Sequence, residues 1–103
     1  MNPFAVHVER ANDPYELRWV MHWPELGAAP DGRRVPPPSS SLGRLIANRS
    51  IRSLSVVRGD LVVRADEWPT GLTAIVHDAV VADRQRGGHW WFEAATTVSV
   101  SRR

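Results

Sequence analysis

Apolar and polar residues alternate along two stretches near the start of the chain. In residues 4–9 and 16–23, apolar side chains occupy every second position and mostly polar ones lie between them. This is the period of a strand with one buried face. Asn12, Asp13 and Pro14 lie between the two stretches, and all three residue types favour turns. The pattern therefore predicts a β-hairpin, in which one face of the second strand is apolar: Leu17, Trp19, Met21 and Trp23.

Residues 24–41 interrupt this regular pattern. They are rich in Pro, Gly, Ala and Ser and include the run Pro36-Pro37-Pro38, a composition typical of an exposed segment with polyproline II character. We expect a long mobile loop here. The serines that close it can cap a short helix, in which Leu42, Leu45 and Ile46 share one face.

The second half of the chain predicts another hairpin, a longer helix and a last strand. Residues 51–57 and 61–65 are rich in β-branched residues and are joined by Arg58-Gly59-Asp60. A helix is expected to start at Asp66 or Thr70 and to end at Gly87-Gly88. Its helical spacing of apolar residues defines one buried stripe: Leu72, Ile75, Val76, Ala79 and Val80. Residues 89–100, aromatic at the start and then rich in Thr and Val, read as a final strand.

These elements predict one α+β domain that spans residues 1–103. The expected order is β-β-α-β-β-α-β, which suits an antiparallel sheet with both helices on one face. No internal repeat and no linker divides the chain.

Composition and charge narrow the classes of function. The 13 basic residues are all arginine and lie scattered along the chain, and with 11 acids the net charge is only +2, so a nucleic-acid partner is not expected. The chain has no cysteine, which excludes disulfides, thiolate metal sites and an iron–sulfur cluster held by the chain itself. No apolar run approaches the roughly 20 residues that span a membrane. We expect a cytoplasmic protein that binds no membrane.

Glu93 is the first candidate for chemistry. In a strand over residues 89–100, Trp91 and Glu93 would share the face that points away from the helices, together with His89. The same argument places His7, Arg18 and His22 of the first hairpin on that open face. A carboxyl group between aromatic rings is partly desolvated, which raises its pKa and lets it deliver a proton near neutral pH. The alternative is that Glu93 is an inert surface partner of Arg18.

The other candidate groups give weaker indications of a functional site. His89 and Glu93, four residues apart on a strand, allow a His/Glu metal site, but their spacing matches no strong ligand signature. We therefore expect no metal and no cofactor. Most of the five tryptophans have the phase of core residues, whereas Trp91 is expected outside, where an indole can stack on flat rings.

The order and spacing of residues 11–82 resemble the N-terminal domain of the Nfu/NifU scaffold proteins. The stretch Asp13 to Trp19 is similar to the start of that domain, and Ser40-Ser41-Leu42-Gly43 to the start of its helix. Residues 50–63 look like its hairpin, and residues 68–80 like its closing Trp and helix. The resemblance implies a ferredoxin-like, Nfu-N-like fold and an accessory role in iron–sulfur cluster assembly. In that family the cluster is held by a Cys-x-x-Cys in a separate domain, which this chain does not contain.

By architecture the chain also resembles the small nosiheptide-type proteins of thiopeptide antibiotic maturation. Those proteins remove an enamide tail and leave a C-terminal amide, with a glutamate on the last strand as the suspected catalyst. The resemblance implies that Glu93 is that catalyst and that the substrate is a modified peptide. Trp91, His89, His7, His22 and Arg18 would then bind the substrate.

Three functions therefore remain open at the level of sequence, and the acid flanked by aromatic residues on the last expected strand favours the first of them. The first is a cofactor-free acid–base enzyme that performs enamide dealkylation on a hydrophobic modified peptide. The second is a non-enzymatic, Nfu-N-like accessory domain. The third is an interaction domain that pairs through the face or edge of its sheet, which includes a homodimer through the sheet.

Overall fold

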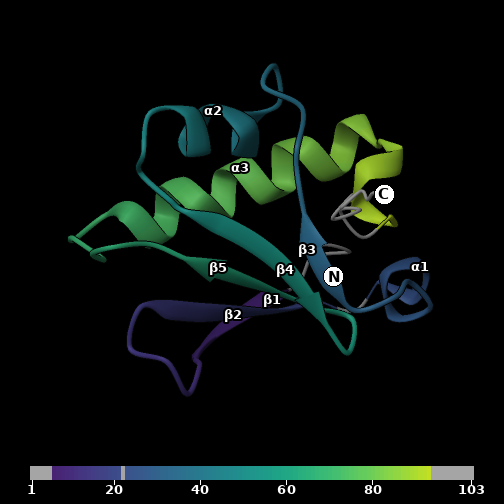
Figure 1. Ribbon diagram of the computed structural model, residues 1–103, viewed down its shortest axis with the longest axis horizontal. Helices are drawn as coiled ribbons and strands as arrows, with labels where there is room; N and C mark the ends of the chain where they lie inside the picture. The colour runs from purple at the N-terminus through teal and green to yellow at the C-terminus, as the bar shows by residue number, and fades with distance from the viewer. Residues whose placement is uncertain (1–5, 22, 94–103) are drawn as a thin grey trace, which may run out of the picture.

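The computed structural model describes residues 6–21 and 23–93 and is an α+β fold (Figure 1). Within this part, a five-stranded antiparallel sheet has the strand order β1-β2-β5-β4-β3. The helices α2 and α3 lie beside each other on the same side of the sheet. The elements are β1 Val6–Arg10, β2 Glu16–Met21, α1 Pro24–Gly27, β3 Gly32–Arg34, α2 Ser41–Ala47, β4 Ser53–Val57, β5 Asp60–Arg64, α3 Leu72–Arg86 and the 3-10 turn η1 His89–Trp91.

The register of the sheet places one apolar face toward the helices. Trp19 lies opposite Leu61, which in turn lies opposite Val56, so these three side chains project from the same face. They join Leu42 of α2 and the buried stripe of α3 in one core. The expected hairpins and the expected apolar face of β2 are confirmed: Trp19, Met21 and Trp23 are buried and Leu17 packs against them.

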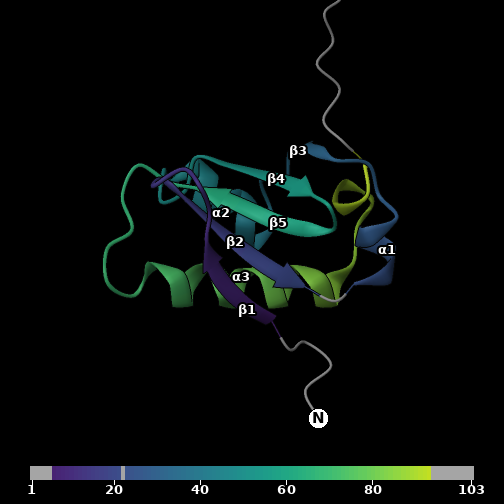
Figure 2. The ribbon, with the colours of Figure 1, turned by 90° about the horizontal axis from the view of Figure 1, so that it is seen from below.

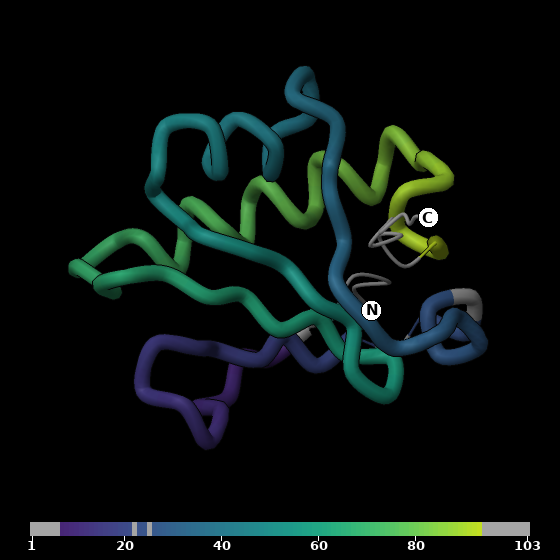
Figure 3. The backbone as a smooth tube through the Cα atoms, viewed as in Figure 1, coloured from purple at the N-terminus to yellow at the C-terminus, as the bar shows by residue number. Residues whose placement is uncertain are grey.

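The expectation of a long loop over residues 24–41 is wrong. Pro24 starts the short helix α1, and β3 adds a strand to the edge of the sheet by pairing with β4. Figure 3 shows this segment passing from α1 across the end of β4 and on to α2. Alternation over three residues is too short a pattern to recognise, and the neighbouring prolines hide it. The unpaired edge of β4 supplies the hydrogen-bonding groups that make β3 a strand.

The expectation of a final strand over residues 89–100 is wrong for the part that the structure describes. Gly87 and Gly88 both have positive φ, 73° and 140°, a conformation that glycine adopts without strain. The chain turns there, and residues 89–91 form η1 instead of a strand. Residues 94–103 lie outside the described part. The fifth strand of the observed sheet is therefore β3.

The helix α3 is confirmed, with two corrections. It begins at Leu72 after Gly71 rather than at Asp66 or Thr70. Ile75, expected in the buried stripe, is 53% exposed. The buried positions are Leu72, Val76, Ala79, Val80 and Asp83, so the stripe lies slightly to one side of the apolar pattern and includes an acid.

The turn between β4 and β5 contains a backbone strain that a single substitution should relieve. Arg58 has φ 53° and Gly59 has φ 82°, the combination of a tight hairpin turn that favours Asn-Gly. We expect Arg58→Asn to raise the free energy of unfolding by about 0.5–1 kcal/mol, measured by urea denaturation. Arg58→Lys retains the strain and should match the wild type. An Arg58→Asn protein no more stable than Arg58→Lys would contradict this account.

Candidate functional site

The face of the sheet opposite the helices carries a row of aligned polar and apolar side chains. The register brings five residues into line across the strands: Glu9, Arg18, Val62, Ser55 and Arg33. None of them belongs to the hydrophobic core. The expected position of His7 and Arg18 on this open face is confirmed, because each lies out of phase with the buried residues of its strand. Figure 2 shows the sheet from below.

Arg18 is fixed on this face by the residues that flank the turn between β4 and β5. Its Nε donates to Asp60 Oδ2 at 2.8 Å, and its Nη2 donates to the carbonyl of Val57 at 3.1 Å. The two charged side chains are only 29% and 18% exposed, so the ion pair is partly shielded from water. Arg18 thus pairs with Asp60, and the expected alternative of a partnership with Glu93 is wrong.

His7 and Glu9 form a second pair on the same face. Nε2 of His7 and Oε2 of Glu9 are 2.7 Å apart, and both side chains are more than half exposed. They are two residues apart on β1, so they project side by side from the outermost strand. Their positions leave them available to a partner.

Two hollows adjoin along this region. The first, of about 390 Å³, lies on the open face and is lined in part by Arg18, Ser55 and Val62. The second, of about 470 Å³, lies at the β1–β2 turn and reaches Trp68. The hollows have four residues in common, Arg10, Ala11, Asn12 and Glu16, but the second also borders Leu17 and Trp68, which pack against the core on the helix side of the sheet. We therefore call the first hollow alone the open-face groove.

Charge pairs stiffen the β1–β2 turn, which lies beside the groove. The pKa of Asp13 is lowered because its carboxylate accepts from the backbone N–H of Tyr15 and from Arg64. The pKa of Arg64 is raised in turn by Asp13. Trp68 donates its indole N–H to the carbonyl of Tyr15 at 2.9 Å. These contacts maintain the shape of the turn, and Asp13 and Arg64 stay charged at neutral pH.

The C-terminal turn forms a separate site, and the expected exposure of Trp91 is wrong. Trp91 is 1% exposed, because η1 folds its ring into the core. It stacks on Trp90 with centroids 4.1 Å apart and meets Trp23 edge-on at 4.9 Å. Glu93 is exposed two residues later. A small hollow of about 140 Å³ lies at this turn and is lined by Trp23, Arg84, Gly87, Trp91 and Phe92.

The residues expected in one site thus lie on two sides of the sheet. His7 and Arg18 are on the open face, whereas His89, Trp91 and Glu93 belong to the turn that packs on the helix side. His22 lies outside the described residues. Within residues 6–21 and 23–93, no group of three or more His, Cys, Asp or Glu side chains is placed to hold a metal ion. No helix in the same part of the chain is long and apolar enough to cross a membrane.

Two buried charged residues were not anticipated. Asp83 of α3 accepts from the backbone N–H groups of Ser41 and Leu42, both at 2.8 Å, and so caps α2 from a neighbouring helix. A signal existed, because Asp83 continues the spacing of Val76, Ala79 and Val80 along the buried stripe.

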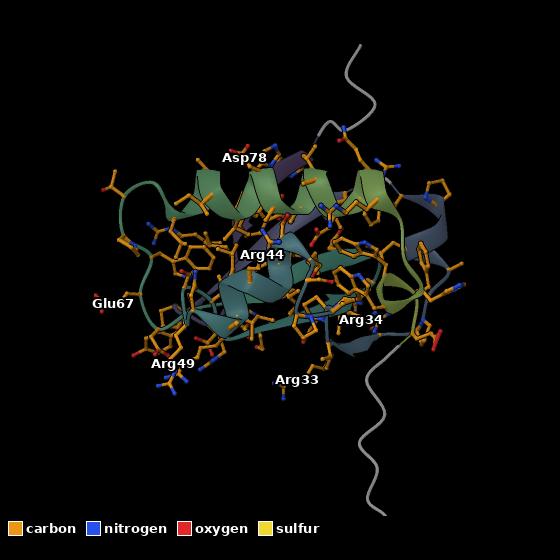
Figure 4. The ribbon with its side chains drawn as sticks, turned by 90° about the horizontal axis from the view of Figure 1, so that it is seen from above. Arg33, Arg34, Arg44, Arg49, Glu67 and Asp78 are labelled. Carbon is orange, nitrogen blue, oxygen red and sulfur yellow. The ribbon has the colours of Figure 1, made fainter. Side chains whose placement is uncertain are left out.

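Arg34 is the other buried charge, at 1% exposure. It donates to three backbone carbonyls: Pro30 at 2.7 Å, Gly32 at 3.0 Å and Trp91 at 2.8 Å. Burial lowers its pKa. The sequence does not mark Arg34 as buried, because it stands next to a second arginine, Arg33, which is exposed (Figure 4). These contacts are structural, because they tie a buried guanidinium to backbone carbonyls of residues 30–32 and of Trp91.

Comparison with known proteins adds no assignment to this geometry: no protein-family model matches the chain, and neither a curated protein nor a solved structure matches it.

Proposed function

We propose that the chain is a non-enzymatic binding domain that acts as an accessory in iron–sulfur cluster assembly, as its resemblance to the Nfu N-terminal domain implies. The observation that carries the proposal is the open-face groove, a hollowed sheet surface whose lining includes Arg18, held in place by Asp60. A binding surface whose side chains are already fixed loses less conformational entropy when a partner docks.

The positions of the elements support the Nfu-like half of the proposal. The helix α2 starts at Ser41, where the resemblance expects it, and Ser40 caps it by accepting from the N–H of Gly43. The hairpin of β4 and β5 and the helix that follows Trp68 also overlap the stretches that carry the resemblance.

The character of the groove favours a protein partner over a small substrate. Half-buried Val57 and Val62 lie in the groove with charged groups of the β1–β2 hairpin, and interfaces commonly combine an apolar centre with a polar rim. The depression is broad and open, whereas small-molecule sites enclose most of their ligand. The partner we propose is a cluster-carrying protein, because this chain has no cysteine to carry a cluster itself.

Titration calorimetry with a purified cluster-carrying scaffold protein tests the proposal. We expect the wild type to bind and Ser55→Arg, which fills the groove, to raise the Kd by about tenfold or more. Ala74→Arg adds the same side chain at an exposed position of α3 and should bind like the wild type. Absence of binding by the wild type would overturn the proposal, and equal binding by both variants would contradict the open-face site.

A second candidate function is the acid–base enzyme, which one specific observation favours. Glu93 is exposed directly beyond the aromatic hollow at the C-terminal turn, where a hydrophobic modified peptide can contact Phe92. In enamide dealkylation, the Glu93 carboxyl would protonate the enamide carbon, and water would add to the acyliminium. The carboxylate would then assist collapse of the carbinolamide to a primary amide and a carbonyl fragment.

Mass spectrometry distinguishes this candidate from the binding domain. A thiopeptide with an extended dehydroalanine tail is incubated with the wild type and with Glu93→Gln. Loss of the tail with the wild type alone supports the enzyme and its catalyst. An unchanged peptide with both proteins excludes the reaction, and an equally active Glu93→Gln protein excludes Glu93 as the acid.

A further inference from the structure

Within residues 6–21 and 23–93, the strand β1 lies at an edge of the sheet and pairs with β2 alone. In this part of the chain, one side of the β1 backbone therefore has no strand partner. The N–H of Ala11 donates to the carbonyl of Glu16, so the hydrogen-bonded pairs of this ladder continue through Glu9 with Arg18 and His7 with Val20. The N–H and C=O groups of Val6, Val8 and Arg10 must therefore point outward, away from β2.

An outward-facing edge of this kind can accept another strand. The five residues of β1 contain no proline, and proline is one of the devices that block edge pairing. The opposite edge is less suitable: β3 has only three residues, and the chain beyond it runs into Pro36-Pro37-Pro38. Of the two edges in the described sheet, β1 is the better template.

The charges on β1 select the occupant of this edge. His7 and Glu9 project from the same face with Val8 between them on the other face. When two such strands run antiparallel with Val8 opposite Val8, His7 of each strand lies opposite Glu9 of the other. A shift by two residues in one direction places His7 against His7, which removes both contacts with Glu9. A shift in the other direction places Glu9 against Glu9, where two carboxylates oppose pairing.

We propose that two copies of this chain associate through β1, antiparallel about a two-fold axis, with Val8 opposite Val8 of the second copy. The contact is self-complementary, as a two-fold interface must be. Val8 exchanges hydrogen bonds with its counterpart, and Val6 does so with Arg10 of the second copy. His7 and Glu9 of the two copies meet in the closer, non-hydrogen-bonded pairs, where side chains interact most strongly.

The axis runs perpendicular to the sheet, so the open faces of both copies point in the same direction. The two sheets then form one continuous surface with a groove in each half. This inference is independent of the proposed function, because it concerns the edge of the sheet and holds whatever the groove binds.

Sedimentation equilibrium of the full chain tests the association. We expect a dimer of twice the 11.5 kDa monomer mass with a Kd of about 10 µM, in the range of small and transient interfaces. Val8→Pro removes an outward N–H that β2 does not use, and it should raise the Kd by about tenfold or more. Arg33→Pro makes the same change at the outward position of β3 and should leave the dimer intact. Far-UV circular dichroism verifies that both variants fold.

A monomeric wild type at concentrations up to about 100 µM would overturn the proposal. So would an equal loss of the dimer in both folded proline variants, since that would place the contact elsewhere.

A cross-linking experiment tests the register without relying on proline. The chain has no cysteine, so a single introduced thiol reports one position. Hydrogen-bonded antiparallel partners have Cα atoms about 5.5 Å apart, within the range that a disulfide bridges. We expect Val8→Cys to form a covalent dimer on mild oxidation and His7→Cys to stay uncrosslinked. The reverse result would overturn the proposed register, and cross-linking of neither would overturn the interface.

Discussion

Replacing Asp83 by alanine is expected to lower the free energy of unfolding by about 3 kcal/mol. Asp83 is 1% exposed and accepts from the first N–H groups of α2. Ser40 Oγ accepts from the next N–H, that of Gly43. Alanine would leave the N–H groups of Ser41 and Leu42 buried without a partner, and a buried unsatisfied donor costs about 1–3 kcal/mol.

Urea denaturation measures this effect, and Asp78→Ala is the matched control. Asp78 lies on the exposed side of the same helix (Figure 4), so its replacement should change the stability by no more than about 0.5 kcal/mol. Asp83→Asn keeps one acceptor oxygen and should fall between the wild type and the alanine variant. A loss in Asp83→Ala as small as that in Asp78→Ala would show that water replaces the carboxylate.

Replacing Arg34 by methionine is expected to cost about 3 kcal/mol and to release the C-terminal turn from the core. Methionine preserves much of the side-chain volume but leaves the carbonyls of Pro30, Gly32 and Trp91 without their donor. Arg34→Lys should rescue little, because an ammonium group cannot reproduce the planar fork that reaches several acceptors at once.

Near-UV circular dichroism follows the turn directly, because Trp91 stacks on Trp90 and packs against Trp23. We expect Arg34→Met to weaken this aromatic signal. Arg33→Met removes the same charge from the exposed neighbouring position and should leave the signal unchanged. Equal signals in the two methionine variants would contradict the role that we assign to Arg34.

Much of the fold follows from local patterns in the sequence. Alternation in residues 16–21 indicated β2 and its buried face, because one-sided burial imposes that alternation. The β-branched runs on either side of Arg58-Gly59-Asp60 indicated the β4–β5 hairpin. Helical spacing indicated α3. In these elements the local pattern and the tertiary contacts select the same structure.

The rest depends on contacts that no local pattern encodes. The strand β3 forms because β4 offers an unpaired edge and Arg34 finds carbonyls from Pro30 to Trp91. The tryptophans of η1 were assigned to a strand because their spacing alone does not reveal the turn at Gly87 and Gly88. For the candidate site, strand phase correctly placed His7 and Arg18 on the open face, but it could not show that the chain turns before Glu93.

The strand order β1-β2-β5-β4-β3 has a consequence for how the chain folds. The β1–β2 and β4–β5 hairpins each join strands that are neighbours in sequence, so each can form rapidly on its own. The central seam between β2 and β5 joins residues as distant as Glu16 and Arg64, and it requires the long segment between the hairpins to close. The meeting of two preformed halves, rather than the growth of any single element, should therefore set the folding rate.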